Sequence, residues 1–554
     1  MHLALGPALL AGFIAVALAL CEARLFFGVD FTDEAFYVAV AYRFALGGTP
    51  YLDELSVPQT TVAVLLAPPV ALYHAVVGRG GLVLFVRELH FVLALGLGSA
   101  VTLALRRPVG GASALLVAVV AVAFVPYAIP SVSYDSAGCE LFTAGSLLVW
   151  WSRSEPRVRL AAGLVLGLAG FVYPPLFPAV ALCCLLSLAL ADGRGRSLLL
   201  RAVAPALSLP LLGFGGLTAR AGPGHVLADY HRAAHYYAEA GGLSKLREIE
   251  TQFRHSFVWW MPLAAALLVL LCARIRRWSR LSALLVVVLP LGLLPAHPLR
   301  YTASLAFVED AGFLALSLLV LARGRREARE LMLLVWLPAL AGGMLTAYAS
   351  TNGGIDFGVG FFPALIVTLV LASWALEGVN VGRLAFAPAL LVAAAMLVIG
   401  VIPVYRDGPL WTLGTRVASG PYAGIATSSG KAQFLIRLET DLGPVSPACR
   451  IAFFDDFPAG YLLTSARIDA NEVWTTSLPR TLTGTYDTEL VRYFYRHGLP
   501  NIVVVMRRIP YSLPGVWQSE GYAPDNPLLV AVRASSYRLV ARRLDYRVYR
   551  RGRC

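Results

Sequence analysis

The sequence predicts a polytopic α-helical membrane protein with a small α/β domain at its C-terminal end. Hydrophobic residues make up 58% of the 554 residues and charged residues only 14%, whereas an ordinary globular chain is about one quarter charged. The mean hydropathy is +0.69. Long apolar runs recur from the N-terminus to about residue 403, where the composition changes to that of a soluble domain. These observations argue against a soluble fold for the whole chain.

Transmembrane helices are expected where about 20 consecutive residues are predominantly apolar, because the hydrocarbon layer is ~30 Å thick. About thirteen apolar segments, some of them shorter than this length, are candidate transmembrane helices. They are approximately residues 6–26, 84–105, 110–128, 138–152, 159–175, 177–191, 198–218, 257–273, 280–296, 303–322, 330–348, 358–376 and 384–403. The first has no basic segment before it and no small-residue cleavage site after it, so we interpret it as an uncleaved helix. The exact helix count stays open around Pro174.

Clustered arginines predict the orientation of these helices, since positively charged short loops stay in the cytoplasm. Alternate loops carry Arg106 and Arg107; Arg153, Arg157 and Arg159; Arg194, Arg196 and Arg201; Arg274, Arg276, Arg277 and Arg280; Arg323, Arg325, Arg326 and Arg329; and Arg383. We predict that these loops are cytoplasmic, so that the tail from about residue 404 faces the periplasm or exterior. The scarcity of lysine, with only Lys245 and Lys431, is typical of a GC-rich genome and favours a bacterial inner (plasma) membrane.

Two modules are predicted, a membrane module over residues 1–403 and an extracytoplasmic soluble α/β domain over residues 404–554. Two external segments of the membrane module are too long to be simple connections. Residues 27–83 contain apolar stretches broken by glycines and prolines, which predicts two or three amphipathic helices at the membrane surface. Residues 219–256 mix histidines, tyrosines and charged residues, and we expect a helix that is partly ordered against the bilayer.

The C-terminal domain has a strand pattern. RIAFF at 450–454 and NIVVVM at 501–506 are typical of strands, and residues 488–499 between them are typical of a helix. The closing sequences YRLVARRL and DYRVYRR alternate like the two strands of a hairpin. Cys449 and Cys554 are the only cysteines of this domain, and they could pair in an oxidising compartment.

The net charge of +13 raises the question of a nucleic-acid partner. Much of this charge comes from the arginines that orient the helices and meet anionic lipid headgroups. We therefore expect membrane lipids as partners and no nucleic acid.

Acidic residues cluster just outside the first predicted span, in the segment DFTDEAFY at residues 30–37. Asp33 and Glu34 would favour the positive N-terminal end of a following helix, and Thr32 or Asp33 would cap it. A second external loop carries Asp135, which would cap the next helix in the same way. The two carboxylates could instead converge on one cleft and act on an acceptor hydroxyl. The residues alone leave both interpretations open.

These features resemble the glycosyltransferase-C superfamily, integral membrane enzymes that move sugars from polyprenyl-phosphate carriers. The resemblance lies in the first external loop, DEAFYVAVAYRFALGGTPY, in Arg87 at the start of the next span, in Asp135, and in the many-helix bundle with an external domain. The chain looks most like the branch that contains lipid A aminoarabinose transferases and protein O-mannosyltransferases. This resemblance implies a catalytic base at Asp33, with Glu34 beside it, and a second acid at Asp135.

A lipid-phosphate donor needs cations at the external interface, and the planar fork of arginine suits phosphate oxygens. The external sequence HPLRY contains His297, Arg300 and Tyr301, and it is similar to a basic-aromatic element that relatives place near the carrier phosphate. Arg87 and His90 are further candidates. An arginine at a helix end can also extend to the lipid headgroups without any ligand.

The leading hypothesis is an inverting glycosyltransferase that moves a sugar from a polyprenyl-phosphate carrier to an extracytoplasmic lipid, glycan or protein. Such a donor is already activated, and the sequence offers no nucleotide-binding loop. The alternative is a membrane transporter or lipid-linked sugar flippase, for which Glu309 and Asp310 would form a proton relay within a span. A sensor whose external domain binds a ligand is a third hypothesis.

No cofactor is certain from the sequence, and the use of a divalent cation stays open. His231 and His235 lie one helical turn apart, but no third metal ligand has suitable spacing. Asn352 and Asp356 lie in the glycine-rich sequence STNGGIDFG. This loop would line the external cavity, although its composition favours a tight turn.

Overall fold

A computed structural model provides the structure of the chain. It describes residues 6–554 with gaps. The gaps are residues 56, 192, 240–244, 248, 252–284, 288–299, 323, 351, 379–383, 455–456, 475–492, 510–516, 519–526 and 553.

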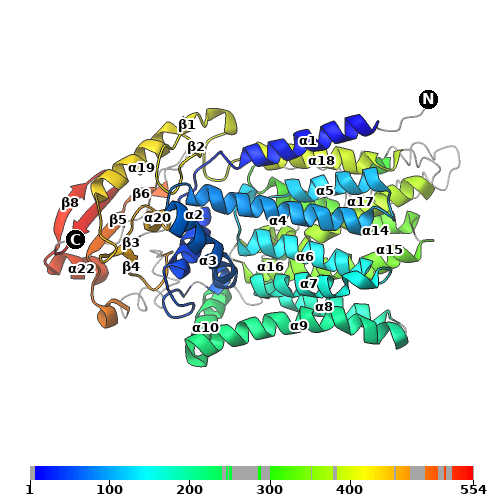
Figure 1. The fold of residues 1–554 in the computed structure, drawn as a ribbon, viewed down its shortest axis with the longest axis horizontal. Helices are drawn as coiled ribbons and strands as arrows, with labels where there is room; N and C mark the ends of the chain where they lie inside the picture. Colours follow the sequence, from blue (N-terminus) through cyan, green and yellow to red (C-terminus); the bar gives the residue numbers. More distant parts are fainter. Residues whose placement is uncertain are drawn as a thin grey trace.

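A bundle of helices forms the larger part of the molecule, and the C-terminal strands lie beyond one end of it (Figure 1). The helices of this part are α1 (Pro7–Arg24), α2 (Asp33–Ala45), α3 (Val57–Val77), α4 (Leu82–Leu105), α5 (Gly111–Ala123), α6 (Tyr134–Trp151), α7 (Arg159–Val172), α8 (Phe177–Ala189), α9 (Gly193–Ala221), α10 (Pro223–Glu239), α14 (Ala303–Leu321), α15 (Arg326–Leu331), α16 (Leu337–Ala349), α17 (Phe357–Gly378) and α18 (Ala387–Val401). Helices α2 and α3 lie at the end that faces the C-terminal strands (Figure 1).

Among the described residues, 7 helices are long and apolar enough to cross a membrane, as judged by length and composition. They span Pro7–Arg24, Gln59–Val77, Leu82–Leu105, Leu200–Ala221, Ala303–Leu321, Arg326–Ala349 and Gly353–Glu377, and shorter apolar helices accompany them. The predicted spans at 257–273 and 280–296 lie largely outside the described residues. The chain is therefore an integral membrane protein with many helices, as predicted.

Helix α3 differs from the sequence expectation. We expected proline to break the apolar stretches of the first external segment, yet α3 continues through Pro68 and Pro69 as interior residues. Membrane helices tolerate interior prolines because neighbouring groups can satisfy the carbonyls that lose their partner. The segment that was expected to contain only surface helices thus includes a helix with the length and composition of a membrane span.

Glycines allow α17 to approach its neighbours closely. A Cβ on Gly360 would lie 2.3 Å from the carbonyl carbon of Gly342 in α16, and one on Gly358 would lie 2.6 Å from the carbonyl oxygen of Leu305 in α14. Small residues at such positions let helix backbones pack against each other in membranes. Helix α17 is accordingly enclosed by the bundle, which fixes the position of Asp356 just before its first residue.

The C-terminal region is a small α/β unit. Its elements are β1 (Thr415–Arg416), β2 (Ala426–Thr427), α19 (Ser429–Leu442), β3 (Arg450–Phe454), α20 (Ala459–Leu462), β4 (Arg467–Ile468), β5 (Ile502–Met506), β6 (Arg508–Ile509), β7 (Trp517–Gln518), α22 (Pro527–Ala534), β8 (Arg538–Arg542) and β9 (Tyr546–Arg550). The main sheet has the order β4-β3-β5-β9-β8.

The sequence predicted the principal strands of this sheet. Strands β3 and β5 occupy the predicted segments and pair in parallel, and β8 and β9 form the predicted antiparallel hairpin. Cys449, directly before β3, forms a disulfide with Cys554. Both the helical membrane part and the small C-terminal α/β unit therefore agree with the predicted fold class.

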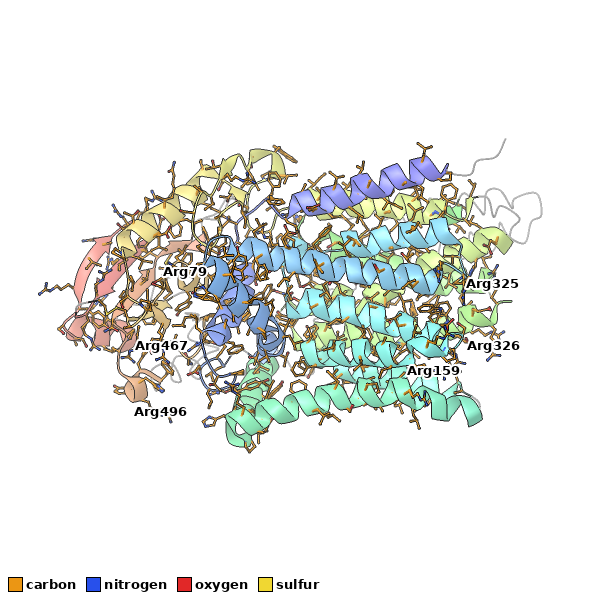
Figure 2. All side chains as sticks on the ribbon, in the orientation of Figure 1. Arg79, Arg159, Arg325, Arg326, Arg467 and Arg496 are labelled. Carbon is orange, nitrogen blue, oxygen red and sulfur yellow. A yellow bond between two sulfur atoms is a disulfide. The ribbon has the colours of Figure 1, made fainter. Side chains whose placement is uncertain are left out.

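Arginines mark the two ends of the molecule. Figure 2 shows Arg159, Arg325 and Arg326 at the end of the bundle that is remote from the C-terminal strands, whereas Arg467 and Arg496 belong to the C-terminal unit. The arginine-rich loops that were assigned to the cytoplasm thus include three residues at the remote end. Which end faces the cytoplasm stays a prediction.

Candidate active site

Asp33 begins helix α2 and its carboxylate has partners from a segment far away in the sequence. The Tyr405 hydroxyl donates a hydrogen bond of 2.7 Å to Asp33 Oδ2, and Arg406 Nη1 lies 2.8 Å from the same oxygen. The Asp33 side chain remains 26% exposed. A carboxylate that is held on one side and open on another can accept a proton from a bound molecule.

The cap of α2 is provided by Asp30. Its Oδ2 atom accepts a hydrogen bond of 2.8 Å from the backbone N–H of Glu34, and its Oδ1 atom accepts one of 2.8 Å from the Thr32 hydroxyl. Thr32, at the N-cap position, makes no side-chain cap bond of its own. The capping interpretation of Thr32 or Asp33 is therefore wrong, because Asp30 satisfies the helix end instead.

Glu34 and Arg87 form a buried ion pair between α2 and α4. Arg87 Nε and Nη2 each donate a hydrogen bond of 2.6 Å to the Glu34 carboxylate. Arg87 also donates to the carbonyl oxygens of Leu25 at 2.5 Å and Gly28 at 2.7 Å. These contacts assign the pair a structural role beneath Asp33. A direct part of either residue in the reaction stays a prediction.

Asp135 lies in the first turn of α6, where it does not act as the cap. Ser133 and Ser136 form the capping box of this helix. The Asp135 side chain is 4% exposed, and its Oδ1 atom has no hydrogen-bond partner among the described residues. The charge of Asp33 acts on Asp135. The segment after α1 and the segment before α6 therefore bring Asp33 and Asp135 close enough for the charge of one to act on the other.

Asp356 is a third acid of this group, in the loop for which the sequence favoured a tight turn over a cavity-lining role. It ends the short 3₁₀ turn Gly353–Asp356 before α17. The side chain is 1% exposed, and its Oδ1 atom has no hydrogen-bond partner in the described part of the chain. The charge of Asp33 acts on Asp356 as well. The nearby Tyr37 is subject to the charges of all four acids, namely Asp30, Asp33, Asp135 and Asp356.

Tyr301, from the segment predicted to bind the donor phosphate, contacts a residue of this site. The Tyr301 ring lies edge-on to the Tyr405 ring with centroids 5.0 Å apart, and Tyr405 binds Asp33. Arg300, the preceding residue, is exposed. His297 lies outside the described residues. The contact between Tyr301 and Tyr405 places Tyr301, the last residue of HPLRY, next to a residue that binds the Asp33 carboxylate.

The C-terminal unit fixes both segments that carry Asp33 and its partners. Lys431 in α19 is 2% exposed and donates to the carbonyl oxygens of Val29 and Arg406. Asp407 Oδ2 accepts a hydrogen bond of 2.8 Å from the backbone N–H of Val29 and lies 3.8 Å from Lys431 Nζ. Lys431, one of only two lysines in the sequence, thus joins the segment before Asp33 to the segment that carries Tyr405 and Arg406.

The remaining candidate residues lie apart from the contacts of Asp33 described above. His90 Nε2 lies 3.3 Å from Glu140 Oε1, and both side chains are buried. Glu309 and Asp310 are buried in α14; the flippase alternative that names them stays untested. Among the described residues, no three His, Cys, Asp or Glu side chains are placed to hold a metal ion.

Comparison with known proteins gives a distant likeness in structure. No protein-family model and no curated protein matches the sequence. The structure is similar to the crystal structure of ArnT from Cupriavidus metallidurans in the apo state, with 16% sequence identity, a TM-score of 0.42 and coverage of 97% of each chain. It is also similar to ArnT from Cupriavidus metallidurans bound to undecaprenyl phosphate, with 16% identity, a TM-score of 0.41 and coverage of 98% of each chain. Because this likeness is distant, the function has to be inferred from the chain's own residues.

Proposed function

We propose that the protein is a membrane glycosyltransferase that moves a sugar from a polyprenyl-phosphate carrier to an extracytoplasmic acceptor, with Asp33 as the general base. The observation that carries the proposal is the partly open Asp33 carboxylate, which is held by Tyr405 and Arg406 and whose charge acts on two buried acids from other loops. An acid-lined site at the end of a membrane bundle suits proton removal from an acceptor hydroxyl.

The reaction needs one proton transfer and one displacement. Asp33 accepts the proton of the acceptor hydroxyl, and the acceptor oxygen attacks the anomeric carbon of the donor sugar. The bond between that carbon and the phosphate oxygen breaks, and the lipid phosphate leaves with the electron pair. Attack opposite the leaving group inverts the anomeric centre. Asp33 is thus the group that makes the acceptor hydroxyl nucleophilic, because it removes the hydroxyl proton.

The donor side requires positive charge, because the leaving phosphate gains charge as the bond breaks. Arg300 and His297 are the proposed phosphate contacts, and Tyr301, which follows Arg300 in the sequence, packs against the Tyr405 ring. Arg406, which pairs with Asp33, adds a cation to the same place.

The proposal places this end of the bundle and the C-terminal unit outside the cytoplasm. Two observations support this orientation. Three arginines of the loops assigned to the cytoplasm lie at the opposite end of the bundle, and the C-terminal unit carries a disulfide between Cys449 and Cys554. Disulfides persist in oxidising compartments and are rare in the cytosol.

The direct test is the Asp33→Asn variant in membranes whose polyprenyl-phosphate sugar pool has been labelled with a radioactive sugar. Asparagine keeps the shape of the side chain but cannot accept the proton, so transfer of label should fall at least ~100-fold. Asp53→Asn is the matched control, because Asp53 lies in the same external segment and accepts a hydrogen bond from the backbone N–H of Thr49. It should retain transfer.

Full transfer by Asp33→Asn would remove this residue from the mechanism. Movement of labelled lipid between the leaflets without sugar transfer, abolished by Glu309→Gln or Asp310→Asn, would establish the flippase in its place.

A further inference from the structure

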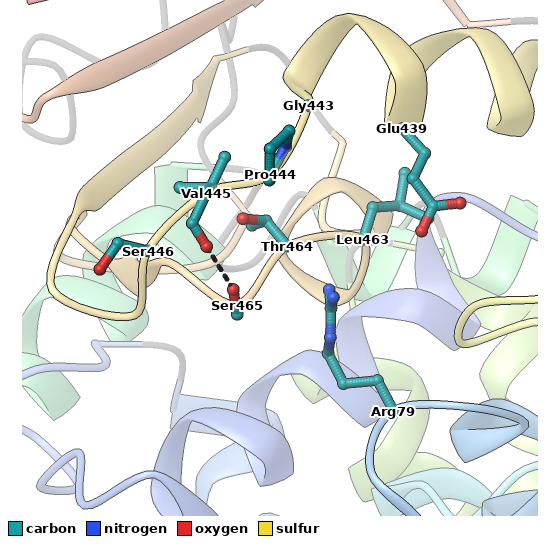
Figure 3. A pocket seen from close by; sticks show the side chains of 9 residues that line it. All are labelled: Arg79, Glu439, Gly443, Pro444, Val445, Ser446, Leu463, Thr464 and Ser465. Atoms are coloured by element: carbon teal, nitrogen blue, oxygen red, sulfur yellow. Dashed lines mark hydrogen bonds between the residues drawn. The ribbon is translucent and has the colours of Figure 1, made fainter. Parts of the chain in front are cut away.

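A polar pocket lies between the membrane part and the C-terminal unit, on residues that the proposed reaction does not use (Figure 3). Its volume is about 570 Å³, which is within the range of ~300–1,000 Å³ typical of small-molecule sites. The pocket is lined by Arg79, Glu439, Gly443, Pro444, Val445, Ser446, Leu463, Thr464 and Ser465.

The membrane part contributes Arg79, from the turn between α3 and α4. This turn is held in place, because Gly81 N–H donates a hydrogen bond of 3.0 Å to the Gly420 carbonyl oxygen and the Tyr73 hydroxyl donates one of 2.6 Å to Gly80. Arg79 Nη1 donates to the Leu462 carbonyl oxygen at 3.2 Å. A guanidinium has five N–H donors, so further donors of Arg79 are left for a ligand.

The C-terminal unit contributes hydroxyl groups and a carboxylate. The Ser465 hydroxyl donates a hydrogen bond of 2.6 Å to the Val445 carbonyl oxygen, which ties the two loops of this wall together. Thr464 is 3% exposed and its oxygen accepts a bond of 3.1 Å from the Ala466 N–H. Among the described residues, the Thr464 proton meets no acceptor and the Glu439 carboxylate makes no ion pair or hydrogen bond.

The pocket therefore offers a fixed cation, a carboxylate and hydroxyl groups around the volume of a small molecule. Sugar hydroxyls can donate to a carboxylate and exchange hydrogen bonds with Thr464, while an anionic substituent needs the guanidinium. A bare anion would be repelled by Glu439, and a neutral sugar would leave the donors of Arg79 unused. We propose that this pocket binds a saccharide that carries a phosphate or carboxylate group.

The proposed binding is independent of the chemistry at Asp33. Helix α20 separates the two places: the N–H of Ala459 at its start donates to the Phe31 carbonyl oxygen at 3.2 Å, near Asp33. Its last residue, Leu462, accepts from Arg79. Binding in the pocket should therefore survive the loss of the Asp33 carboxylate, and a failure of one proposal leaves the other standing.

The test is calorimetric titration of the full-length protein in phosphatidylcholine nanodiscs with glucose 6-phosphate, glucose and inorganic phosphate. Glucose 6-phosphate should bind most tightly. Arg79→Met should weaken it at least tenfold, since a charge-assisted pair is lost, and Arg79→Lys should weaken it less. Thr464→Val and Glu439→Gln should each weaken it severalfold. Asp33→Asn and the surface variant Arg496→Met should bind as the wild type does.

Nanodiscs that also contain phosphatidylinositol distinguish a lipid headgroup from a soluble ligand. If the lipid competes with glucose 6-phosphate, the pocket takes a headgroup; if it does not, the ligand is soluble. The proposal is overturned if none of these probes saturates the protein, or if folded Arg79→Met binds like the wild type. Binding of inorganic phosphate as tight as that of glucose 6-phosphate, unchanged in Glu439→Gln, would reduce the pocket to a simple anion site.

Discussion

Arg87 donates two hydrogen bonds of 2.6 Å to the carboxylate of Glu34. Glu34 directly follows Asp33 in α2, and Arg87 lies near the start of α4. Both side chains are at most 2% exposed. Two charges in such a place are tolerable only as a pair, because each alone would be desolvated without compensation. The ion pair therefore holds the first turn of α2, and with it Asp33, against the bundle.

Breaking this pair should destabilise the fold. Glu34→Gln or Arg87→Met leaves one buried charge unpaired, which costs about 3–5 kcal/mol. The double variant removes both charges and should be less destabilised than the sum of the two. Thermal unfolding of the purified proteins in detergent measures this coupling. Strictly additive losses would mean that the two side chains do not depend on each other.

Tyr405 should orient Asp33 rather than take part in proton transfer. Tyr405→Phe removes the hydrogen bond of 2.7 Å to Asp33 but keeps the ring against Tyr301. We expect kcat to fall about tenfold with little change in KM, because misorientation of a catalytic group affects the transition state. Tyr73→Phe, which loses a hydrogen bond to a backbone oxygen, is the control for the loss of a tyrosine hydroxyl. An unchanged kcat in Tyr405→Phe would exclude the orienting role.

Asp30 should make the stability depend on pH. Burial, with a further contribution from the Asp33 charge, raises the pKa of Asp30 from 3.8 to about 6. Between these two pKa values the folded protein binds more protons at Asp30 than the unfolded chain does. The contribution of Asp30 to the free energy of unfolding therefore falls as pH rises. The fall is at most about 3 kcal/mol.

The matched variant is Asp30→Asn, which is neutral at every pH and should lack this fall. The measurement is the difference in melting temperature between wild type and variant from pH 4 to pH 7. As pH rises, the melting temperature of the wild type should fall relative to that of Asp30→Asn. A constant difference would show that Asp30 has the same pKa in the folded and the unfolded state.

The disulfide should stabilise the C-terminal unit. It links residues separated by 105 positions in the sequence, and removal of such a cross-link typically costs about 2–5 kcal/mol. The double variant Cys449→Ser, Cys554→Ser should have a lower melting temperature than the wild type. A reducing agent should lower the melting temperature of the wild type to the same value. A wild type that is insensitive to reduction would mean that the two thiols are not joined in the purified protein.

The orientation can be tested in cells. Alkaline phosphatase fused after Cys554 should be active, since this enzyme folds only where its disulfides form. A green fluorescent protein that requires a reducing compartment should be dark at the same point. The reverse pattern would place the proposed active site in the cytoplasm and remove the polyprenyl-phosphate donor on the external face from the mechanism.

The sequence predicted most elements because local patterns determine them. Apolar length alone indicated the membrane helices, and alternation indicated the hairpin of β8 and β9. The position of Asp33 outside the first span was also visible in the sequence. The capping assignment failed because Thr32, Asp33 and Asp30 all have suitable side chains, and only backbone geometry decides which oxygen reaches the Glu34 N–H.

The tertiary structure alone decided which residues surround Asp33. Tyr405 is 372 positions away from Asp33, and Lys431 is 402 positions away from Val29, whose carbonyl oxygen it binds. Neither follows a motif or a periodic pattern that would reveal its partner. The sequence by itself determined a helical membrane protein with an acidic segment after its first helix and a C-terminal α/β unit, because burial and periodicity act on neighbouring residues. The site depends on contacts between distant segments, and only packing of the bundle against the C-terminal unit fixes these.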